Sequence, residues 1–260
     1  MKQQSQNNGY LIVASKEDVY YAWALNLIEQ IKDYHPEAKV CFVTEERFCD
    51  GREKIADHII FCDDNYRAKL WGMAQSPFDK TFYIDADMEC LHEDIALVFD
   101  ELGDNDMVFT DLREECYHIF RDIHFPGGKF TLCGGVCLYD SSNPLVMEFM
   151  QEWYDIYVQQ RAGHWWPTDE EGNYDKETYP YHLRHWDQFT LWWLTEKVEK
   201  YKDLKIGVFE DNYRWNYWSL LHREVPMPEN TVLYHKSYTA TKNLSEITAI
   251  QVGDHFEPKV

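Results

Sequence analysis

Two closely spaced aspartates end a short apolar run, Thr81-Phe82-Tyr83-Ile84-Asp85-Ala86-Asp87-Met88-Glu89. The run is typical of a β-strand, in which side chains two positions apart point to the same face, so Asp85 and Asp87 can project to one side. Burying two like charges that close is costly unless a cation neutralises them. Carboxylate oxygens suit Mg²⁺ or Mn²⁺, ions that commonly share their coordination with substrate phosphates. The spacing therefore predicts a metal site, with an ordinary acidic strand-to-loop corner as the alternative.

Two further side chains occur where predicted strands end. Asp111 closes the apolar run 106–111, and His235 closes the late run 231–235. A histidine after a strand is more typically a surface or hydrogen-bonded residue than a ligand. Here it could supply a nitrogen ligand from the far side of the sheet. Such a mixed carboxylate–imidazole set favours Mn²⁺ over Mg²⁺, because imidazole suits softer ions.

The elements that position these residues alternate between strand and helix in the first half of the chain. Ser15 or Asp18 can cap a first helix whose apolar positions run from Ala24 to Ile31. Apolar runs predict strands at 10–15, 39–44, 58–62, 81–85 and 106–111, with a second helix at 68–74. Strands of this unalternating kind indicate a doubly wound, mostly parallel sheet. Ligands bind beyond the carboxyl ends of such strands, where Asp85, Asp87 and Asp111 fall.

The second half of the chain contains two more candidate positions. Gly134 and Gly135 lie inside a predicted strand at 130–139, which indicates either a β-bulge or the close approach of another group such as a sugar. Asp187-Gln188 begins a predicted aromatic helix at 187–198. Asp187 is either a plain N-cap or part of a polar pair presented to the site. The remaining predicted elements are a helix at 144–158, a long loop or lid at 161–181, and strands at 205–209 and 231–235.

Composition excludes several classes of function. The formal net charge of −21 argues against general affinity for nucleic acid, although a metal ion and a few local cations can still hold a phosphate-bearing substrate. Seven cysteines without a CxxC pair predict reduced thiols and neither a disulfide framework nor a zinc ribbon. No apolar run approaches the length of a membrane span or a signal peptide, so we expect a soluble, cytoplasmic protein.

The assembled pattern resembles the family of glycogenin and the bacterial lipopolysaccharide galactosyltransferases. The resemblance covers roughly residues 10–242 and rests on the order of elements together with five motifs: Lys69-Leu70, Asp85-Ala86-Asp87, Gly134-Gly135, Asp187-Gln188 and His235. It implies the α/β GT-A fold, Rossmann-like with a mostly parallel sheet flanked by helices. A single domain would span 1–260, with 1–9 as a flexible N-terminus and 243–260 as a C-terminal tail. The implied reaction moves a sugar from a nucleotide diphosphate sugar, UDP-linked, to a hydroxyl of a carbohydrate or glycan acceptor with retention at the anomeric carbon.

The resemblance also implies roles for individual residues. It assigns Asp85, Asp87 and His235 to a Mn²⁺ site, with Mg²⁺ as the alternative and Asp87 as the stronger of the carboxylate ligands. The residues implied in nucleotide binding are Ala14, Tyr20, Asp85 and Ala86. Those implied in binding the donor sugar are Lys69, Asp111, Gly134 and Gly135. Asp187 and Gln188 fall at the catalytic position near the anomeric centre, where a front-face route and a covalent intermediate are both open.

Three departures from the family pattern affect these assignments. Cys133 replaces an asparagine two residues before Gly135, which bears on the identity of the sugar. Trp186 replaces the glycine before Asp187. After His235 the family's glycine and lysine are missing, because Tyr238 takes the place of the first and Lys242 comes one residue late. Diphosphate contacts there would have to come from Lys236 or Lys242.

Two other classes of function share some of these features. Phosphatases of the haloacid dehalogenase type also end a strand in Asp-x-Asp and form an aspartyl-phosphate. They place the motif near the N-terminus and follow it with Thr or Val, whereas here several elements precede it and Glu89 follows. A non-catalytic relative that only binds carbohydrate or nucleotide sugar would keep the fold and would bind sugar without depending on a metal.

Overall fold

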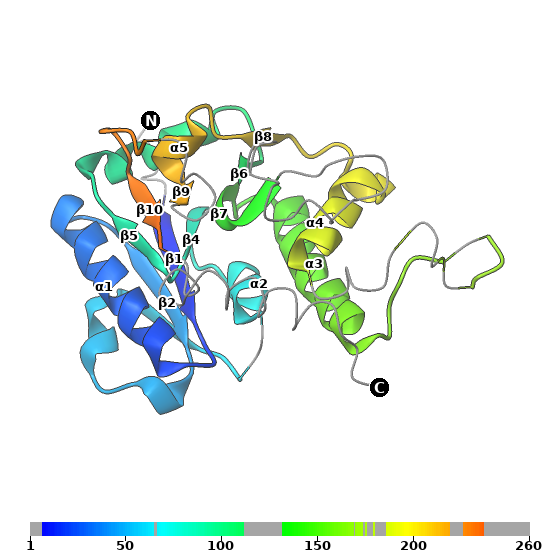
Figure 1. The fold of residues 1–260 in the computed structure, drawn as a ribbon, viewed down its shortest axis with the longest axis horizontal. Coiled ribbons are helices and arrows are strands. Elements are labelled where there is room, and N and C mark those ends of the chain that lie inside the picture. Colours follow the sequence, from blue (N-terminus) through cyan, green and yellow to red (C-terminus); the bar gives the residue numbers. More distant parts are fainter. Residues whose placement is uncertain are drawn as a thin grey trace, which may run out of the picture.

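The central element is a seven-stranded sheet with the order β3-β2-β1-β4-β7-β6-β8 (Figure 1). The computed structural model describes residues 7–64, 67–111, 132–168, 170–173, 175, 179, 186–218 and 226–236. The strands are β1 (Asn8–Ala14), β2 (Val40–Thr44), β3 (His58–Phe61), β4 (Lys80–Asp85), β6 (Met107–Asp111), β7 (Leu132–Asp140) and β8 (Ile206–Val208). Only β7 runs antiparallel to its neighbours β4 and β6. This confirms the predicted α/β fold with a mostly parallel sheet.

Helices cover both faces of this sheet, which explains the unalternating apolar strands. Successive residues of β1 enter opposite cores: Tyr10 and Ile12 pack in the cluster that includes α1, whereas Leu11 and Val13 pack in the cluster that includes α2, α3 and α4. Figure 1 shows α1 on one side of the sheet and α3 and α4 on the other. The helices are α1 (Asp18–Tyr34), α2 (Ala68–Met73), α3 (Pro144–Ala162), α4 (Asp187–Glu196) and α5 (Asn212–Trp215).

Helix α3 shows how local sequence fixes the end of an element. Its N-cap Asn143 accepts a hydrogen bond from the Leu145 backbone N–H at 3.0 Å, and Pro144 occupies the first turn. The helix continues past the predicted end at residue 158 to Ala162, where Gly163 takes the left-handed conformation with φ of 75°. A glycine suits that C-terminal position because it has no Cβ.

A second, three-stranded sheet contains β5 (Met88–Cys90), β10 (Leu233–His235) and β9 (Tyr217–Trp218). β10 runs antiparallel to β5 and parallel to β9. The sequence predicts only β10 of these three, and it also misses the 3₁₀ helices η1 (Glu46–Phe48), η2 (Arg52–Ile55), η3 (Glu93–Leu102) and η6 (Glu199–Tyr201). This small sheet brings the end of β10 beside the turn that follows β4.

The boundaries of the described chain bear on several sequence-based expectations. β1 begins at Asn8, two residues before the predicted start, because Asn8 and Gly9 pair with Lys80 and Thr81 of β4. Most of the predicted flexible segment 1–9, all of the predicted tail 243–260 and parts of the predicted lid 161–181 lie outside the described residues.

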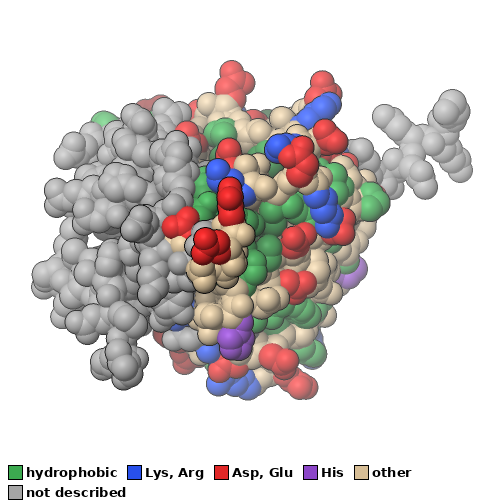
Figure 2. All heavy atoms as spheres, turned by 90° about the vertical axis from the view of Figure 1, so that its right-hand side faces the viewer, with side chains coloured by type: hydrophobic (Ala, Val, Ile, Leu, Met, Phe, Trp, Pro, Cys, Tyr) green, Lys and Arg blue, Asp and Glu red, His purple; other side chains and the backbone are tan. Residues whose placement is uncertain are grey.

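Within the described part of the chain, no helix has the length and apolarity needed to cross a membrane. On the face drawn in Figure 2, acidic side chains are interspersed with basic and hydrophobic ones.

Trp153 of α3 links the core to the carboxyl edge of the sheet. It is fully buried, its ring meets Phe109 and Phe149 edge-on, and its indole N–H donates to the Asp187 carbonyl at 3.0 Å. Trp153→Ala should lower the free energy of unfolding by ~3–5 kcal/mol through loss of burial and creation of a cavity. Urea denaturation would measure this beside Val158→Ala, a control on the same helix whose side chain is 40% exposed. Equal losses in the two variants would contradict the assignment of Trp153 to the core.

Candidate functional site

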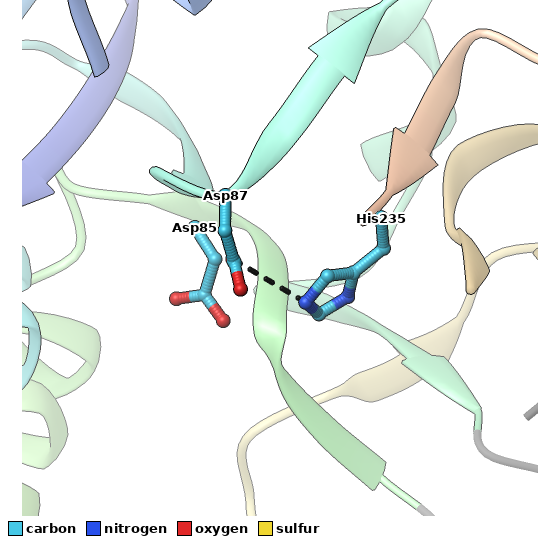
Figure 3. A group of neighbouring side chains, drawn as sticks. All are labelled: Asp85, Asp87 and His235. Atoms are coloured by element: carbon cyan, nitrogen blue, oxygen red, sulfur yellow. Dashed lines mark ion pairs between the residues drawn. The ribbon is translucent and has the colours of Figure 1, made fainter. Parts of the chain in front are cut away.

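The predicted metal ligands come together at the carboxyl edge of the sheet. Asp85 is the last residue of β4, Asp87 lies in the turn between β4 and β5, and His235 ends β10. One ligand atom from each lies within 4.8 Å of the other two, and the His235 Nε2 atom is 3.3 Å from Asp87 Oδ1 (Figure 3). The sequence predicts both aspartates on one face of a strand end. In the structure the turn at Ala86 and Asp87 has the same effect.

Asp85 is surrounded by groups that hold its carboxylate in place. Lys69 Nζ lies 3.4 Å from Asp85 Oδ1, and the Tyr83 hydroxyl donates a hydrogen bond to the same oxygen. Burial raises the pKa of Asp85 and the Asp87 carboxylate adds to this, although Lys69, His235 and Tyr83 act in the opposite direction. A cation placed between the two carboxylates would relieve their repulsion.

Gly135 leaves room for the Asp85 side chain. A Cβ at Gly135 would lie 2.9 Å from Asp85 Oδ2, closer than real Cβ contacts come, so a larger residue would displace the carboxylate. The neighbouring Gly134 leaves room for Trp153, whose Cη2 would lie 3.0 Å from such a Cβ. The pairing of β6 with β7 shifts register in this region, an irregularity in line with the β-bulge that the sequence offers as one of two explanations. Packing thus accounts for both glycines, while their role toward a donor sugar stays a prediction.

Asp187 is the first residue of α4, and Trp186 is the N-cap, so the alternative that Asp187 is the cap is wrong. Its Oδ2 atom lies 3.3 Å from Arg67 Nε and 3.3 Å from Lys69 Nζ. Burial would raise the pKa of Asp187, but Arg67 and Lys69 outweigh it and lower the pKa to about 2. Asp187 is therefore a fixed negative charge that shares Lys69 with Asp85.

Lys69 is the cation that connects the two acidic groups. Besides Asp85 and Asp187, its Nζ atom contacts the Gly134 carbonyl at 3.4 Å. Burial alone would lower the pKa of Lys69, but the two carboxylates outweigh it and raise the pKa, so the ammonium stays charged.

Gln188, on α4, contacts the start of β7, where Cys133 lies. The Gln188 side-chain amide donates to the Leu132 carbonyl at 3.0 Å. Cys133, which replaces the family's asparagine, is buried, and this burial raises the pKa of its thiol to about 11. At neutral pH a thiol of that pKa is protonated, which disfavours a nucleophilic role.

A cavity of about 430 Å³ opens beside the carboxylate pair. Its lining includes three of the predicted nucleotide-binding residues, Tyr20, Asp85 and Ala86, together with the cationic side chains of Lys16, Arg67 and Lys69. Ala14 ends β1 just before Ser15, which also lines the cavity. Lys16 has φ of 77°, unusual for a residue with a side chain, and its backbone N–H donates to the buried Glu45 carboxylate at 2.6 Å. The chain thus turns sharply at the wall of this cavity.

Asp111 and Lys236 are the predicted contacts of the donor sugar and of the diphosphate, and the structure shows the contacts of each. Asp111 lies at the same edge, where the Asn212 side chain holds its backbone N–H at 2.6 Å, and its role toward a donor sugar stays a prediction. Lys236 hydrogen-bonds through its backbone N–H to the Asp87 carbonyl at 3.1 Å, while its side chain pairs with Glu89. The departures at Tyr238 and Lys242 lie outside the described residues.

Sequence reasoning misses four residues that shape the site: Arg67, Tyr83, Asn216 and Trp218. Arg67 stands two positions before Lys69, and this basic pair in Arg67-Ala68-Lys69 is a local signal that could have revealed it. Asn216 and Trp218 carry no such signal, because they reach His235 only through the pairing of β9 with β10.

Comparison of this fold with solved structures identifies a class of enzyme folds. The galactosyltransferase LgtC, in complex with donor and acceptor sugar analogs, matches with a TM-score of 0.53 and 16% identity over 96% of this chain and 98% of its own. A glycosyltransferase involved in glycosylation of the major capsid of PBCV-1 matches with a TM-score of 0.51 and 12% identity over 94% and 98%. The glycosyltransferase GlyE of Streptococcus pneumoniae matches with a TM-score of 0.54 and 13% identity over 96% and 64%.

The chain therefore has the GT-A glycosyltransferase fold, which confirms the predicted resemblance at the level of fold. No model of a known protein family and no curated protein sequence matches it. At identities of 12–16% the shared property is the architecture, so the reaction has to be argued from the site itself.

The ion pairs of Asp187 predict a specific acid sensitivity. Its pKa of about 2 in the folded protein lies below the ordinary value of 3.8, so the ionised form stabilises the fold above pH 4 and this contribution is lost as the pH falls toward 2. The shift corresponds to ~2 kcal/mol. In urea titrations, Asp187→Asn should be less stable than the wild type at pH 6, and the gap should close between pH 4 and pH 2.

The control for this measurement is Asp203→Asn. Asp203 is an exposed carboxylate that precedes β8, at the opposite edge of the sheet from Asp187. The free energy of unfolding of Asp203→Asn should stay close to that of the wild type at every pH. A gap for Asp187→Asn that stays constant down to pH 2 would show that the carboxylate is not held by Arg67 and Lys69.

Proposed function

We propose that this protein is a metal-dependent glycosyltransferase that moves a sugar from a UDP-sugar to a hydroxyl of a carbohydrate acceptor, with retention at the anomeric carbon. One observation carries the proposal: Asp85, Asp87 and His235 converge beside a cavity that Lys16, Arg67 and Lys69 also line. Anionic ligands for a cation and cationic side chains for an anion thus face one space. A metal-bound diphosphate is the chemistry that such a pairing accommodates.

The donor set fits a divalent cation such as Mn²⁺. Two carboxylates and one imidazole supply hard oxygen ligands and a nitrogen ligand, a mixture that suits Mn²⁺ better than Mg²⁺. All three side chains are at most partly exposed, so the repulsion between the Asp85 and Asp87 carboxylates is poorly screened without a cation. When bound, the metal ion would neutralise the charge that develops on the departing nucleoside diphosphate.

The chain's own residues would bind and orient the donor. Ala14, Tyr20 and Ala86 lie at or beside the cavity wall and are proposed to hold the nucleoside, with the Tyr20 ring stacked on the base. Lys69 would move toward the diphosphate or the sugar from its present position between Asp85 and Asp187. Asp111, Gly134 and Gly135 are proposed to contact the sugar itself.

Transfer breaks the bond between the anomeric carbon and the phosphate oxygen and forms a bond to the acceptor oxygen. The acceptor's proton passes to the departing phosphate oxygen. Asp187, kept ionised by Arg67 and Lys69, would stabilise the positive charge that grows on the sugar ring, and Gln188 would orient the ring from the same helix end. Because Asp187 is a weak base with a low pKa, its electrostatic role is favoured over proton abstraction.

The fold and the surroundings of Asp85 favour this function over an aspartyl-phosphate phosphatase. Lys69 and Tyr83 both engage Asp85 Oδ1, which lowers the nucleophilicity of that oxygen. Asp87 is in turn paired with His235. Carboxylates held in this way suit the proposed metal ligation better than nucleophilic attack.

The metal site can be tested by binding Mn²⁺ and UDP, because a ligand of the folded form raises the melting temperature. In the wild type the two should stabilise the fold more together than the sum of each alone. Asp87→Asn keeps the size of the side chain but removes the charge, so it should abolish the Mn²⁺-dependent part of the UDP shift. His235→Ala should weaken this Mn²⁺-dependent shift less, since two carboxylates remain.

Asp203→Asn is the control for this test. With its exposed carboxylate at the other edge of the sheet, it should behave like the wild type. Wild-type Mn²⁺ dependence in Asp87→Asn would show that the metal site is misplaced.

Tyr20 tests the nucleotide end of the cavity. It lies on α1, half-buried, with its ring edge-on to Trp23 at 5.6 Å. Loss of one base–aromatic stack weakens binding by ~1–3 kcal/mol, so Tyr20→Ala should raise the UDP Kd about 5- to 150-fold in calorimetric titrations with Mn²⁺ present. Tyr20→Phe keeps the ring and should keep the affinity. A lower melting temperature with an unchanged Kd would mean that Tyr20 only packs against the helix.

A further inference from the structure

The imidazole of His235 is held on three sides. Its Nδ1 atom lies 3.3 Å from Asn216 Oδ1, its Nε2 atom lies 3.3 Å from Asp87 Oδ1, and the Trp218 ring stacks on it at 4.6 Å with an interplanar angle of 13°. Only 5% of His235 is exposed. The ring therefore has a defined orientation before any ligand binds.

Asn216 has a defined orientation of its own. Its amide nitrogen Nδ2 donates to the Thr110 hydroxyl at 3.0 Å, and both residues are buried. The amide oxygen is the atom turned toward His235. Because an amide oxygen can only accept a hydrogen bond, Nδ1 of His235 carries the hydrogen. In the neutral ring the lone pair is then on Nε2, the atom that faces Asp87 and Asp85.

Asn216 is in turn anchored to the main sheet through α5. One helical turn earlier, the Asn212 side chain accepts from the Asp111 backbone N–H and donates to the Asp111 carbonyl. The two asparagines thus fasten the segment from α5 to β9 onto Thr110 and Asp111 at the end of β6. Parallel pairing of β9 with β10 then sets Trp218 opposite His235.

We propose that Asn216 is a positioning residue that fixes the tautomer and the direction of His235, so that Nε2 is presented as a metal ligand. The inference rests on the proposed metal site and adds to it a residue that would not touch the ion. Groups that hydrogen-bond the second nitrogen of a ligating histidine commonly change metal affinity 10- to 100-fold when they are removed. A purely structural Asn216 would instead affect stability and leave the affinity of the folded protein unchanged.

The test measures Mn²⁺ affinity by the electron paramagnetic resonance signal of free Mn²⁺ at one fixed pH, without UDP. Asn216→Ala should raise the Kd about 10- to 100-fold. Asn216→Asp keeps an acceptor at Nδ1 and should bind Mn²⁺ within a few-fold of the wild type. Asn212→Ala is the matched control, because it removes hydrogen bonds from the same short segment without touching His235, and its Kd should rise far less than that of Asn216→Ala.

A double-mutant cycle separates action through His235 from a general loosening. In a His235→Ala background, Asn216→Ala should change the Mn²⁺ Kd less than about twofold, since its target is gone. In addition, ¹⁵N NMR of the metal-free wild type should show His235 with the hydrogen on Nδ1, and Asn216→Ala should lose that single tautomer.

The outcomes distinguish this inference from the function on which it rests. A wild type that binds no Mn²⁺ would overturn the metal site and the inference together. A wild type that binds Mn²⁺ beside an Asn216→Ala variant of equal affinity would overturn the role of Asn216 alone. Two further results would also overturn it, because they would show a general loosening of α5. One is an Asn212→Ala variant whose Mn²⁺ affinity falls as much as that of Asn216→Ala. The other is an Asn216→Ala effect of undiminished size in the His235→Ala background.

Discussion

The organisation of the carboxyl edge depends on the closeness of two carboxylates, Asp85 and Asp87. Two like charges 4 Å apart repel by about 1 kcal/mol in water and by about 4 kcal/mol near a protein surface, so the fold has to supply compensation. Lys69 supplies part of it, because its Nζ atom lies 3.4 Å from Asp85 Oδ1. Gly135 leaves the space in which the Asp85 carboxylate lies. The residues around the pair are therefore explained by its charge before any ligand is considered.

The position of His235 beside the carboxylate pair requires a second sheet. The turn at Ala86 and Asp87 directs the chain out of the main sheet into β5, and β10 pairs with β5 so that His235 lies opposite Met88. β9 then covers the other edge of β10, and α5 joins this small sheet to the end of β6. The proposed metal ligand on β10 is thus fixed to the centre of the molecule by short elements, each of which has little stability alone.

Sequence reasoning finds the parts of this arrangement that local patterns determine. The buried strands are visible because burial on both faces gives unalternating apolar runs. The Asp85–Asp87 pair is visible because two carboxylates stand within three consecutive residues at the end of such a run. β5, β9 and α5 are too short to show a period, so they cannot be predicted in the same way. The position of Asp187 was equally ambiguous, since an N-cap and the first helical residue look alike in sequence. Its partners Arg67 and Lys69 lie far away along the chain, and only the packing of α2 against α3, and of α3 against α4, brings them together.

The sharing of Lys69 makes the two acidic parts of the site interdependent. Asp187 and Asp85 both contact its ammonium group, at 3.3 and 3.4 Å. A charge added near one carboxylate therefore changes the electrostatic interaction of Lys69 with the other. In the proposed reaction an incoming diphosphate would compete with Asp85 for Lys69. A cation between Asp85 and Asp87 would then replace the positive charge that Asp85 loses. Asp187 would keep Arg67 and remain ionised. The site can therefore accept an anion and a cation together at a lower electrostatic cost than either alone, which is the physical basis for expecting the two to bind cooperatively.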